Sequence, residues 1–289
     1  MENNVEKKWY VVNTYSGHES FPCKSLWLKK GYDFIVNGLN FNSSDAVVHL
    51  GVGKNMVSSI RYWLRCFNIT SDDKLTDIAH YLFDNEKGKD PYLEDLGTLW
   101  LSHFLIVSKT EATLYYLLFA GLQKERKFFE KQQVANYVKR IMTEQNKFNQ
   151  YNENTVKKDI TTLLQMYVLP QKNKTYDDFS SLLIDLELIR HDADAKNYVF
   201  NIEGKQKLPW QIFLYAIIAT KGIDNSVSYD VLQELGMIFC MNDMEVIEMC
   251  KVIEANKPNI IRYSDTAGIR QLQFIGQINK ESVLDEYYG

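Results

Sequence analysis

The sequence predicts a mainly α-helical protein with small β-hairpins, built from tandem helix-turn-helix or winged-helix units. Three observations support this fold class. The chain has 289 residues, of which 45% are apolar and 24% are charged, as in ordinary globular proteins. Apolar residues recur at helical spacing along most of the chain. Pairs of β-prone runs joined by polar turns follow the helices in the middle and at the C-terminal end.

The length of the chain suits two or three domains. We expect an N-terminal extension at 1–16 and an N-terminal helical domain with a helix-turn-helix at 17–122. A middle winged-helix-like domain at 123–205 and a C-terminal acidic winged-helix-like domain at 206–289 follow.

The N-terminal domain contains the clearest two-faced helix, expected over Asn55–Ile69. Its predicted core stripe is Met56, Ile60, Trp63, Leu64 and Phe67. Its opposite face is polar and basic, with Lys54, Ser58, Arg61 and Arg65. A short helix over Asp45–Leu50, capped by Ser43 or Ser44, and the turn Gly51–Gly53 come before it, which is the order of a helix-turn-helix.

Such a basic face can contact DNA phosphates and base edges, although a solvated surface helix has the same pattern. Two further apolar helices are expected in this domain, over Thr76–Phe83 and Gly97–Phe104.

The middle domain repeats the pattern, with helices expected over Gln133–Met142 and Asn154–Val168. The second helix has a predicted core stripe of Val156, Ile160, Leu163, Leu164 and Tyr167. Its outward face is predicted to hold Lys157, Lys158, Thr161, Thr162 and Gln165. A hairpin formed by Leu182–Arg190 and Asn197–Ile202 would supply the wing.

In the C-terminal domain, helices are expected over Trp210–Thr220, Tyr229–Leu235 and Asp243–Glu254, the last one capped by Asp243. A hairpin of Ile260–Tyr263 and Arg270–Ile275 follows. Because the last of these helices exposes Glu245 and Glu248, we expect this domain to contact protein rather than DNA.

Basic residues are in excess in parts of the first two predicted domains, and acidic residues are in excess in part of the third. Ser20–Arg65 holds six basic and two acidic residues, and Lys124–Asp159 holds nine basic and five acidic ones. Asp224–Glu254 holds seven acidic residues and one basic residue. An anionic partner is therefore expected to meet the first two domains.

The four cysteines form no CxxC pair, so neither structural zinc nor a disulfide framework is expected. The N-terminal residues lack the apolar region of a signal peptide, and no apolar run reaches bilayer length. We expect a soluble cytoplasmic protein without a membrane partner.

The sequence assigns no catalytic or metal-binding residue. Asp192 or Asp194, followed by Glu203 and Lys205, loosely resembles the carboxylates and lysine of some metal-dependent nucleases, but a solvated hairpin is the more common meaning of such residues. His18–Glu19 and the group Asp90, Glu94 and Asp95 are the other places where metal ligands could converge. Mg²⁺ or Mn²⁺ would be a cofactor only if the protein nicks DNA.

Three stretches carry a family resemblance: Gly17–Phe34, Gly51–Arg65 and Asp90–Phe104. Together they resemble the bacterial domain-of-unknown-function family numbered 4007, whose members are similar to the SspB component of DNA phosphorothioation and phage-defence systems. The resemblance implies a role on DNA beside a cysteine desulfurase, an ATP pyrophosphatase-like protein and an ATPase.

Members of the SspB type have been credited with DNA nicking, but the resemblance assigns no catalytic residue. The leading hypothesis is a DNA-binding component of such a system, with Lys54, Ser58, Arg61, Arg65, Lys157 and Lys158 at the interface. The alternatives are a metal-dependent nicking endonuclease and a protein-docking adaptor.

Overall fold

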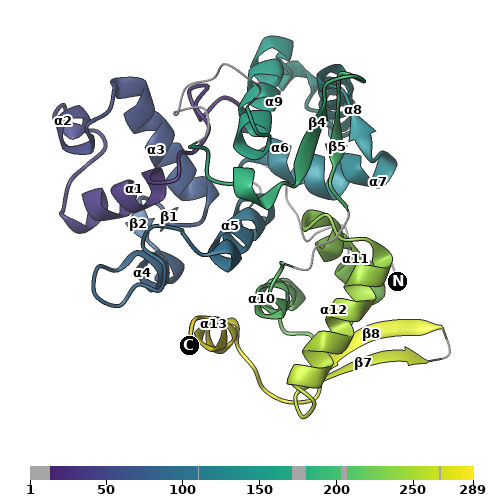
Figure 1. Ribbon diagram of the computed structural model, residues 1–289. Coiled ribbons are helices and arrows are strands. Elements are labelled where there is room, and N and C mark those ends of the chain that lie inside the picture. The colour runs from purple at the N-terminus through teal and green to yellow at the C-terminus, as the bar shows by residue number, and fades with distance from the viewer. Residues whose placement is uncertain (1–13, 110, 171–179, 203–206, 267) are drawn as a thin grey trace. The chain divides into compact units, whose positions relative to one another are not determined.

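The computed structural model describes residues 14–109, 111–170, 180–202, 207–266 and 268–289 (Figure 1). The protein is mainly helical, with 54% helix and 12% strand, and its small sheets are antiparallel, as the sequence predicts. The chain divides into two compact units, Met1–Phe200 and Asn201–Gly289. The predicted domain at 17–122 lies wholly in the first unit, together with all but the last residues of the predicted domain at 123–205.

The N-terminal half of the first unit is a helical cluster with one short hairpin. Its elements are α1 (Trp27–Val36), α2 (Ala46–Leu50), α3 (Lys54–Cys66), β1 (Thr70–Ser71), β2 (Lys74–Leu75), α4 (Asp77–Phe83) and α5 (Leu96–Ser108). The side chains of Thr76 and Asp95 cap α4 and α5 by accepting backbone N–H groups.

The predicted helix pair and turn are present as α2 and α3. Gly51 ends α2 in the left-handed conformation, at φ 62°, which glycine adopts without steric cost. The residue preceding α2 is Asp45, not Ser43 or Ser44, and the Ser43 hydroxyl instead donates to the Asp45 carboxylate. The expected serine cap is therefore wrong, because that serine bonds to a side chain rather than to the backbone of the helix.

The buried face of α3 is wider than predicted. Ile60, Trp63, Leu64 and Phe67 are buried as expected, whereas Met56 is only half-buried. Val57, Ser59, Tyr62 and Cys66 are buried as well. The outward face that remains is narrow and holds Lys54, Ser58 and Arg65, with Arg61 at its half-buried edge.

The second half of the first unit begins with α6 (Thr113–Tyr116), a π-helical segment (Leu117–Leu122) and α7 (Gln123–Glu125). It continues with β3 (Phe128–Phe129), α8 (Lys131–Glu144), a 3₁₀ turn (Phe148–Gln150), α9 (Glu153–Tyr167), a second 3₁₀ turn (Ile184–Leu186), β4 (Ile189–Asp192) and β5 (Asn197–Phe200). The three strands pair antiparallel in the order β3-β5-β4.

Two predictions about this half are corrected. The first strand of the hairpin begins at Ile189 rather than Leu182, because a 3₁₀ turn and the positive φ of Glu187 (48°) interrupt the extended chain before it. On α9 the predicted core stripe is buried, but Thr162 is buried too, at 2% exposure, instead of facing outward.

The second unit contains a strand, two helices and a hairpin in the same order as the segment from β3 to β5 of the first unit. Its elements are α10 (Trp210–Lys221), β6 (Ser226–Ser228), α11 (Tyr229–Ile238), α12 (Asp243–Asn256), β7 (Ile261–Thr266), β8 (Ile269–Phe274) and α13 (Lys280–Tyr288). Its strands pair in the order β6-β8-β7. The cap of α12 is Asn242, in a capping box with Glu245, and not Asp243 as expected from the sequence.

Within the described part of the chain, every helix is too short or too polar to cross a lipid bilayer.

The packing of α1 on α3 depends on a close contact at a glycine inside the first unit. A Cβ atom added at Gly31 would lie 2.6 Å from the Cδ1 atom of Leu64, which is fully buried.

Replacing Gly31 by alanine should therefore destabilise the protein, although alanine is the better helix former. We expect the free energy of unfolding to fall by about 1–3 kcal/mol through overpacking, measured by urea denaturation. Gly53→Ala is the control, because a Cβ atom there meets nothing within 4 Å. It should cost less than about 1 kcal/mol, as a poorer helix cap. Equal losses in the two variants would contradict the close α1–α3 contact.

Candidate nucleic-acid interface

The outward face of α3 borders a hollow of about 620 Å³ with a mixed apolar and polar lining. The hollow lies between the first half of α3 and the segment that leads into α2. Its polar lining consists of Asn42, Ser43, Ser44, Lys54, Ser58 and Arg61. Three of the four residues predicted on this face therefore meet at one place, and hydroxyl, amide and cationic groups of this kind suit a phosphate.

Arg61 is bonded within the protein. Its Nε atom donates to Asp73 Oδ1 at 3.0 Å, and its Nη1 atom donates to Asn42 Oδ1 at 2.9 Å. Donation of a hydrogen bond to Asp73 raises the pKa of Arg61, and the same bond lowers the pKa of Asp73. Arg61 would have to leave Asp73 before it could read a base edge.

Arg65 differs from Arg61 in two respects. It is exposed and does not line the hollow on α3. Its charge also helps to lower the pKa of Asp73, after the larger contribution of Arg61. The sequence placed the two arginines on one face correctly, but it gave no sign of this acidic partner.

A second hollow, of about 550 Å³, lies along α9. It is lined by Ser20, Asn154, Lys157, Lys158, Thr161, Thr162 and Gln165. Lys157 and Lys158 are both exposed, and Lys157 forms an ion pair of 2.6 Å with Glu153 one turn earlier. Because that pair is exposed, it contributes little to stability and can be exchanged for a phosphate.

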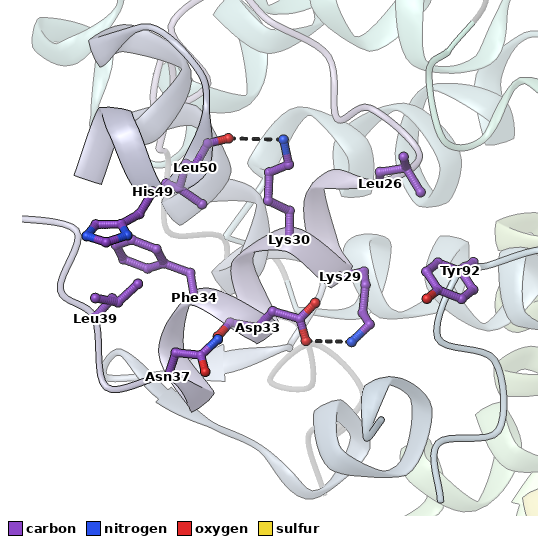
Figure 2. A pocket seen from close by; sticks show the side chains of 10 residues that line it. All are labelled: Leu26, Lys29, Lys30, Asp33, Phe34, Asn37, Leu39, His49, Leu50 and Tyr92. Atoms are coloured by element: carbon purple, nitrogen blue, oxygen red, sulfur yellow. Dashed lines mark hydrogen bonds and ion pairs between the residues drawn. The ribbon is translucent and has the colours of Figure 1, made fainter. Parts of the chain in front are cut away.

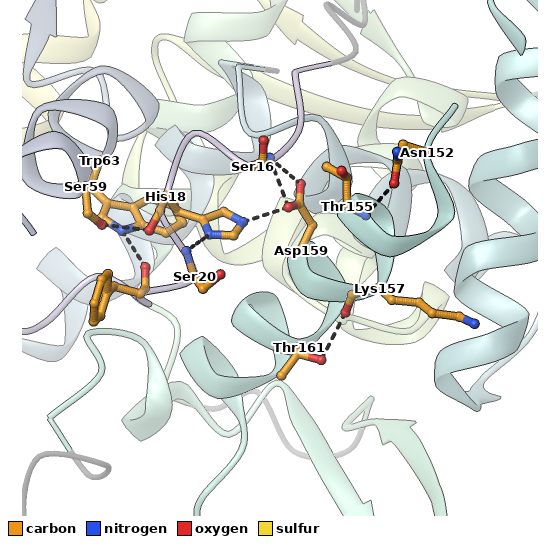
Figure 3. A network of polar contacts seen from close by, with 11 residues as sticks. Ser16, His18, Ser20, Ser59, Trp63, Asn152, Thr155, Lys157, Asp159 and Thr161 are labelled. Carbon is orange, nitrogen blue, oxygen red and sulfur yellow. Dashed lines mark hydrogen bonds and ion pairs between the residues drawn. The ribbon is translucent and has the colours of Figure 1, made fainter. Parts of the chain in front are cut away.

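A buried polar network joins the loop before α1 to α9 (Figure 3). The Nε2 atom of His18 lies 2.8 Å from Asp159 Oδ1, and the Ser16 backbone N–H donates to the same carboxylate at 3.0 Å. The side chains of His18 and Asp159 are only 4% and 6% exposed. Asp159 follows Lys158 directly, so this carboxylate fixes the helix that carries the two lysines.

The same loop is held against α3. The Ser59 hydroxyl donates to the His18 carbonyl oxygen at 3.0 Å, and Trp63 Nε1 donates to the Phe21 carbonyl oxygen at 3.0 Å. The imidazole of His18 also stacks on the Trp63 ring, with an interplanar angle of 13°. Ser59 directly follows Ser58, which lines the hollow on α3. One loop thus positions both basic helices.

The hydrogen bonds also define the tautomer of His18. The Ser20 backbone N–H donates to His18 Nδ1 at 3.0 Å, so Nδ1 acts as an acceptor. The ring proton therefore belongs on Nε2, where it is donated to Asp159. From the sequence His18 is a possible metal ligand, whereas in the structure it donates to Asp159, a residue that the sequence prediction missed. The sequence contains one sign of this role, because Asp159 directly precedes the core position Ile160 and lies about one helical turn after the core position Val156.

The other candidate ligand groups have structural roles. Asp90 accepts the backbone N–H groups of Glu94 and Asp95, each at 3.0 Å. Asp192 accepts those of Asp194 and Ala195, each at 3.1 Å, in the turn between β4 and β5. Glu203 and Lys205 lie outside the described residues. Among the residues that are described, no three His, Cys, Asp or Glu side chains are grouped to hold a metal ion.

All four cysteines are buried. Burial raises the pKa of Cys250 to about 12, and burial also raises the pKa of Cys23 and Cys66. A reactive cysteine requires an accessible thiolate, so these side chains are packing groups rather than nucleophiles.

A third hollow, of about 580 Å³, lies beside α1 and contains two lysines (Figure 2). Lys29 bonds to Asp33 and to Asn85 Oδ1, each at 2.5 Å, and Lys30 Nζ donates to the Leu50 carbonyl oxygen at 3.0 Å. Because both ammonium groups already bond within the protein, this hollow is less suited to an anion than the two on α3 and α9.

Removing the Asp159 carboxylate should destabilise the first unit. In Asp159→Ala the buried Nε2 proton of His18 would lose its acceptor, and the backbone N–H of Ser16 would lose its partner as well, so we expect the free energy of unfolding to fall by about 1–3 kcal/mol. The control is Asp194→Ala at an exposed hairpin position, which should change stability by less than about 0.5 kcal/mol. If chemical denaturation gave the same midpoint for Asp159→Ala and the wild type, the network would not be a structural tie.

Comparison with known proteins gives a family and two similar structures. The family described as "Protein of unknown function (DUF4007)" matches residues 15–288. A crystal structure of SspB is similar over 96% of this chain and 88% of its own, with 27% identity and a TM-score of 0.84. A magnesium ion-bound crystal structure of SspB covers the same shares, with 26% identity and a TM-score of 0.82. A search of curated proteins gives no match. The resemblance indicated by the sequence motifs is confirmed, and the chain belongs to the DUF4007 family.

Proposed function

We propose that this protein is a DNA-binding component of a bacterial phosphorothioation and anti-phage defence system. The similarity to SspB over nearly the whole chain supports membership of such a system. The observation that carries the DNA-binding role is the pair of basic hollows on α3 and α9, whose helices are both hydrogen-bonded to the loop before α1. A polyanion with regularly spaced phosphates suits two such hollows better than a small ligand does.

We further propose that two segments are winged-helix units, β3-α8-α9-β4-β5 and β6-α11-α12-β7-β8. The order of elements supports this, because in each segment two helices lie between a short strand and a hairpin, and the second strand of the hairpin pairs with the first strand. α9 is then the DNA-facing helix of its unit.

In this proposal the residues have different tasks. Lys54, Lys157 and Lys158 contact phosphates, and Ser58 donates a hydroxyl hydrogen bond in the hollow on α3. Arg61 reads a base edge only after exchanging Asp73 for DNA, and Arg65 assists by its charge.

The acidic second unit is proposed to dock the partner proteins that the family resemblance implies: a cysteine desulfurase, an ATP pyrophosphatase-like protein and an ATPase, in the cytoplasm. Its helix α12 presents Glu248 outward, in an exposed ion pair with Lys251. Glu245, by contrast, belongs to the helix cap. A basic surface on a partner would suit this face better than DNA would.

Replacing both lysines of α9 should weaken DNA binding irrespective of sequence. In Lys157→Gln/Lys158→Gln, the loss of two phosphate contacts should lower the slope of log K against log salt concentration by roughly 2, measured by fluorescence anisotropy on duplex DNA. The control is Lys87→Gln/Lys89→Gln, which changes two exposed lysines outside both hollows. A slope unchanged from the wild type would contradict phosphate contacts at α9.

DNA nicking is a second candidate function, favoured by the similarity to a structure of SspB that contains a magnesium ion. Among the described residues, no three His, Cys, Asp or Glu side chains are grouped as ligands for such an ion.

If the protein is a nickase, supercoiled plasmid should become relaxed when Mg²⁺ or Mn²⁺ is added, and a chelator should prevent this. The variant Lys157→Gln/Lys158→Gln should nick more slowly because it binds DNA less tightly. An absence of relaxed product, even with the partner proteins present, would remove the nickase hypothesis and leave the DNA-binding proposal standing.

A further inference from the structure

Two aromatic side chains lie in the turn between α8 and α9. Phe148 begins the 3₁₀ turn, and Tyr151 follows its end, two residues before α9 begins. Their rings are nearly parallel, with an interplanar angle of 10° and centroids 6.1 Å apart, within the range of offset aromatic pairs. The Phe148 side chain is 51% exposed, so one ring of the pair is open to solvent.

Two lysines, from α8 and α9, lie near this aromatic pair, together with the carboxylate of Glu153. Lys139 of α8 places its Nζ atom 5.6 Å from the centroid of the Phe148 ring. Lys157 of α9 forms an ion pair of 2.6 Å with Glu153, two residues after Tyr151. Burial raises the pKa of Tyr151 and Glu153 raises it further, whereas Lys157 acts in the opposite direction. Lys157 also lines the hollow on α9. The pair thus adjoins the surface proposed to hold DNA phosphates.

A single exposed phenylalanine is ordinary on a protein surface. The combination here is more specific, because a half-exposed ring is stacked on a second ring and has lysines from two helices beside it. Proteins that hold unpaired nucleotides use this arrangement, in which bases stack on aromatic rings and basic groups follow the backbone. An apolar peptide would gain nothing from the surrounding ammonium groups.

We propose that Phe148 and Tyr151 form a stacking site for an unpaired DNA base, next to the phosphates held at Lys157 and Lys158. The site takes a nucleobase of a bulge, gap or single strand, and it reads no sequence because each base offers a π-face. Lys139 is exposed and flexible enough to move from the ring to the phosphate of the stacked nucleotide. This inference rests on the proposed DNA-binding function.

The test uses the full-length protein and two DNA probes, a plain duplex and the same duplex with a short unpaired loop that contains 2-aminopurine. Stacking on an aromatic ring changes the fluorescence of this base analogue, and anisotropy gives the affinity for each probe. The wild type should bind the looped probe about 10-fold more tightly than the duplex and quench its fluorescence.

Phe148→Leu should lose both the quenching and this preference while keeping its affinity for the duplex, and Phe148→Tyr should retain both. Phe128→Leu is the matched control, since Phe128 is 60% exposed but belongs to β3. Because both positions are exposed, the variants should fold normally.

A wild type without quenching or preference, or a Phe148→Leu variant that behaves like the wild type, would overturn the stacking site. Normal binding to the duplex in those cases would leave the DNA-binding function intact. A wild type that binds neither probe would overturn both proposals.

Discussion

The buried hydrogen bond between His18 and Asp159 is the contact on which the rest of the proposed DNA surface depends. It connects a loop near the N-terminus to a helix about 140 residues later in the chain, and the same loop is bonded to α3 through Ser59 and Trp63. A buried carboxylate is tolerable only when its acceptor sites are filled, and here a ring N–H and a backbone N–H fill them. This polar contact therefore fixes the position of α9 relative to the loop before α1.

The basic residues around this network are not equivalent. The guanidinium of Arg61 donates hydrogen bonds to Asp73 and Asn42. Lys29 and Lys30 also donate hydrogen bonds within the protein, beside α1. Lys54 and Lys158 project from exposed positions, and Lys157 is held only by an exposed ion pair. Because exposed pairs are weak, the lysines rather than Arg61 are the groups most readily available to an incoming phosphate.

The sequence was sufficient for local structure. Periodicity predicted α3 and α9 within a few residues, and the shared basic faces proved to line two hollows. It could not reveal contacts between distant segments, such as His18 with Asp159 or Arg61 with Asp73, because spacing along the chain carries no information about them. The misplaced start of β4 has a local reason instead, because the 3₁₀ turn at Ile184–Leu186 and the positive φ of Glu187 interrupt the extended chain before it.

The central claim is that one DNA molecule covers α3 and α9 together. Acetylation of lysines with a small reagent, followed by mass spectrometry with and without duplex DNA, tests it directly. The account predicts that DNA protects Lys54, Lys157 and Lys158 in parallel as its concentration rises, while Lys87 and Lys251 react as before. Protection of neither helix, or protection of Lys54 alone with Lys157 and Lys158 still reactive, would contradict it.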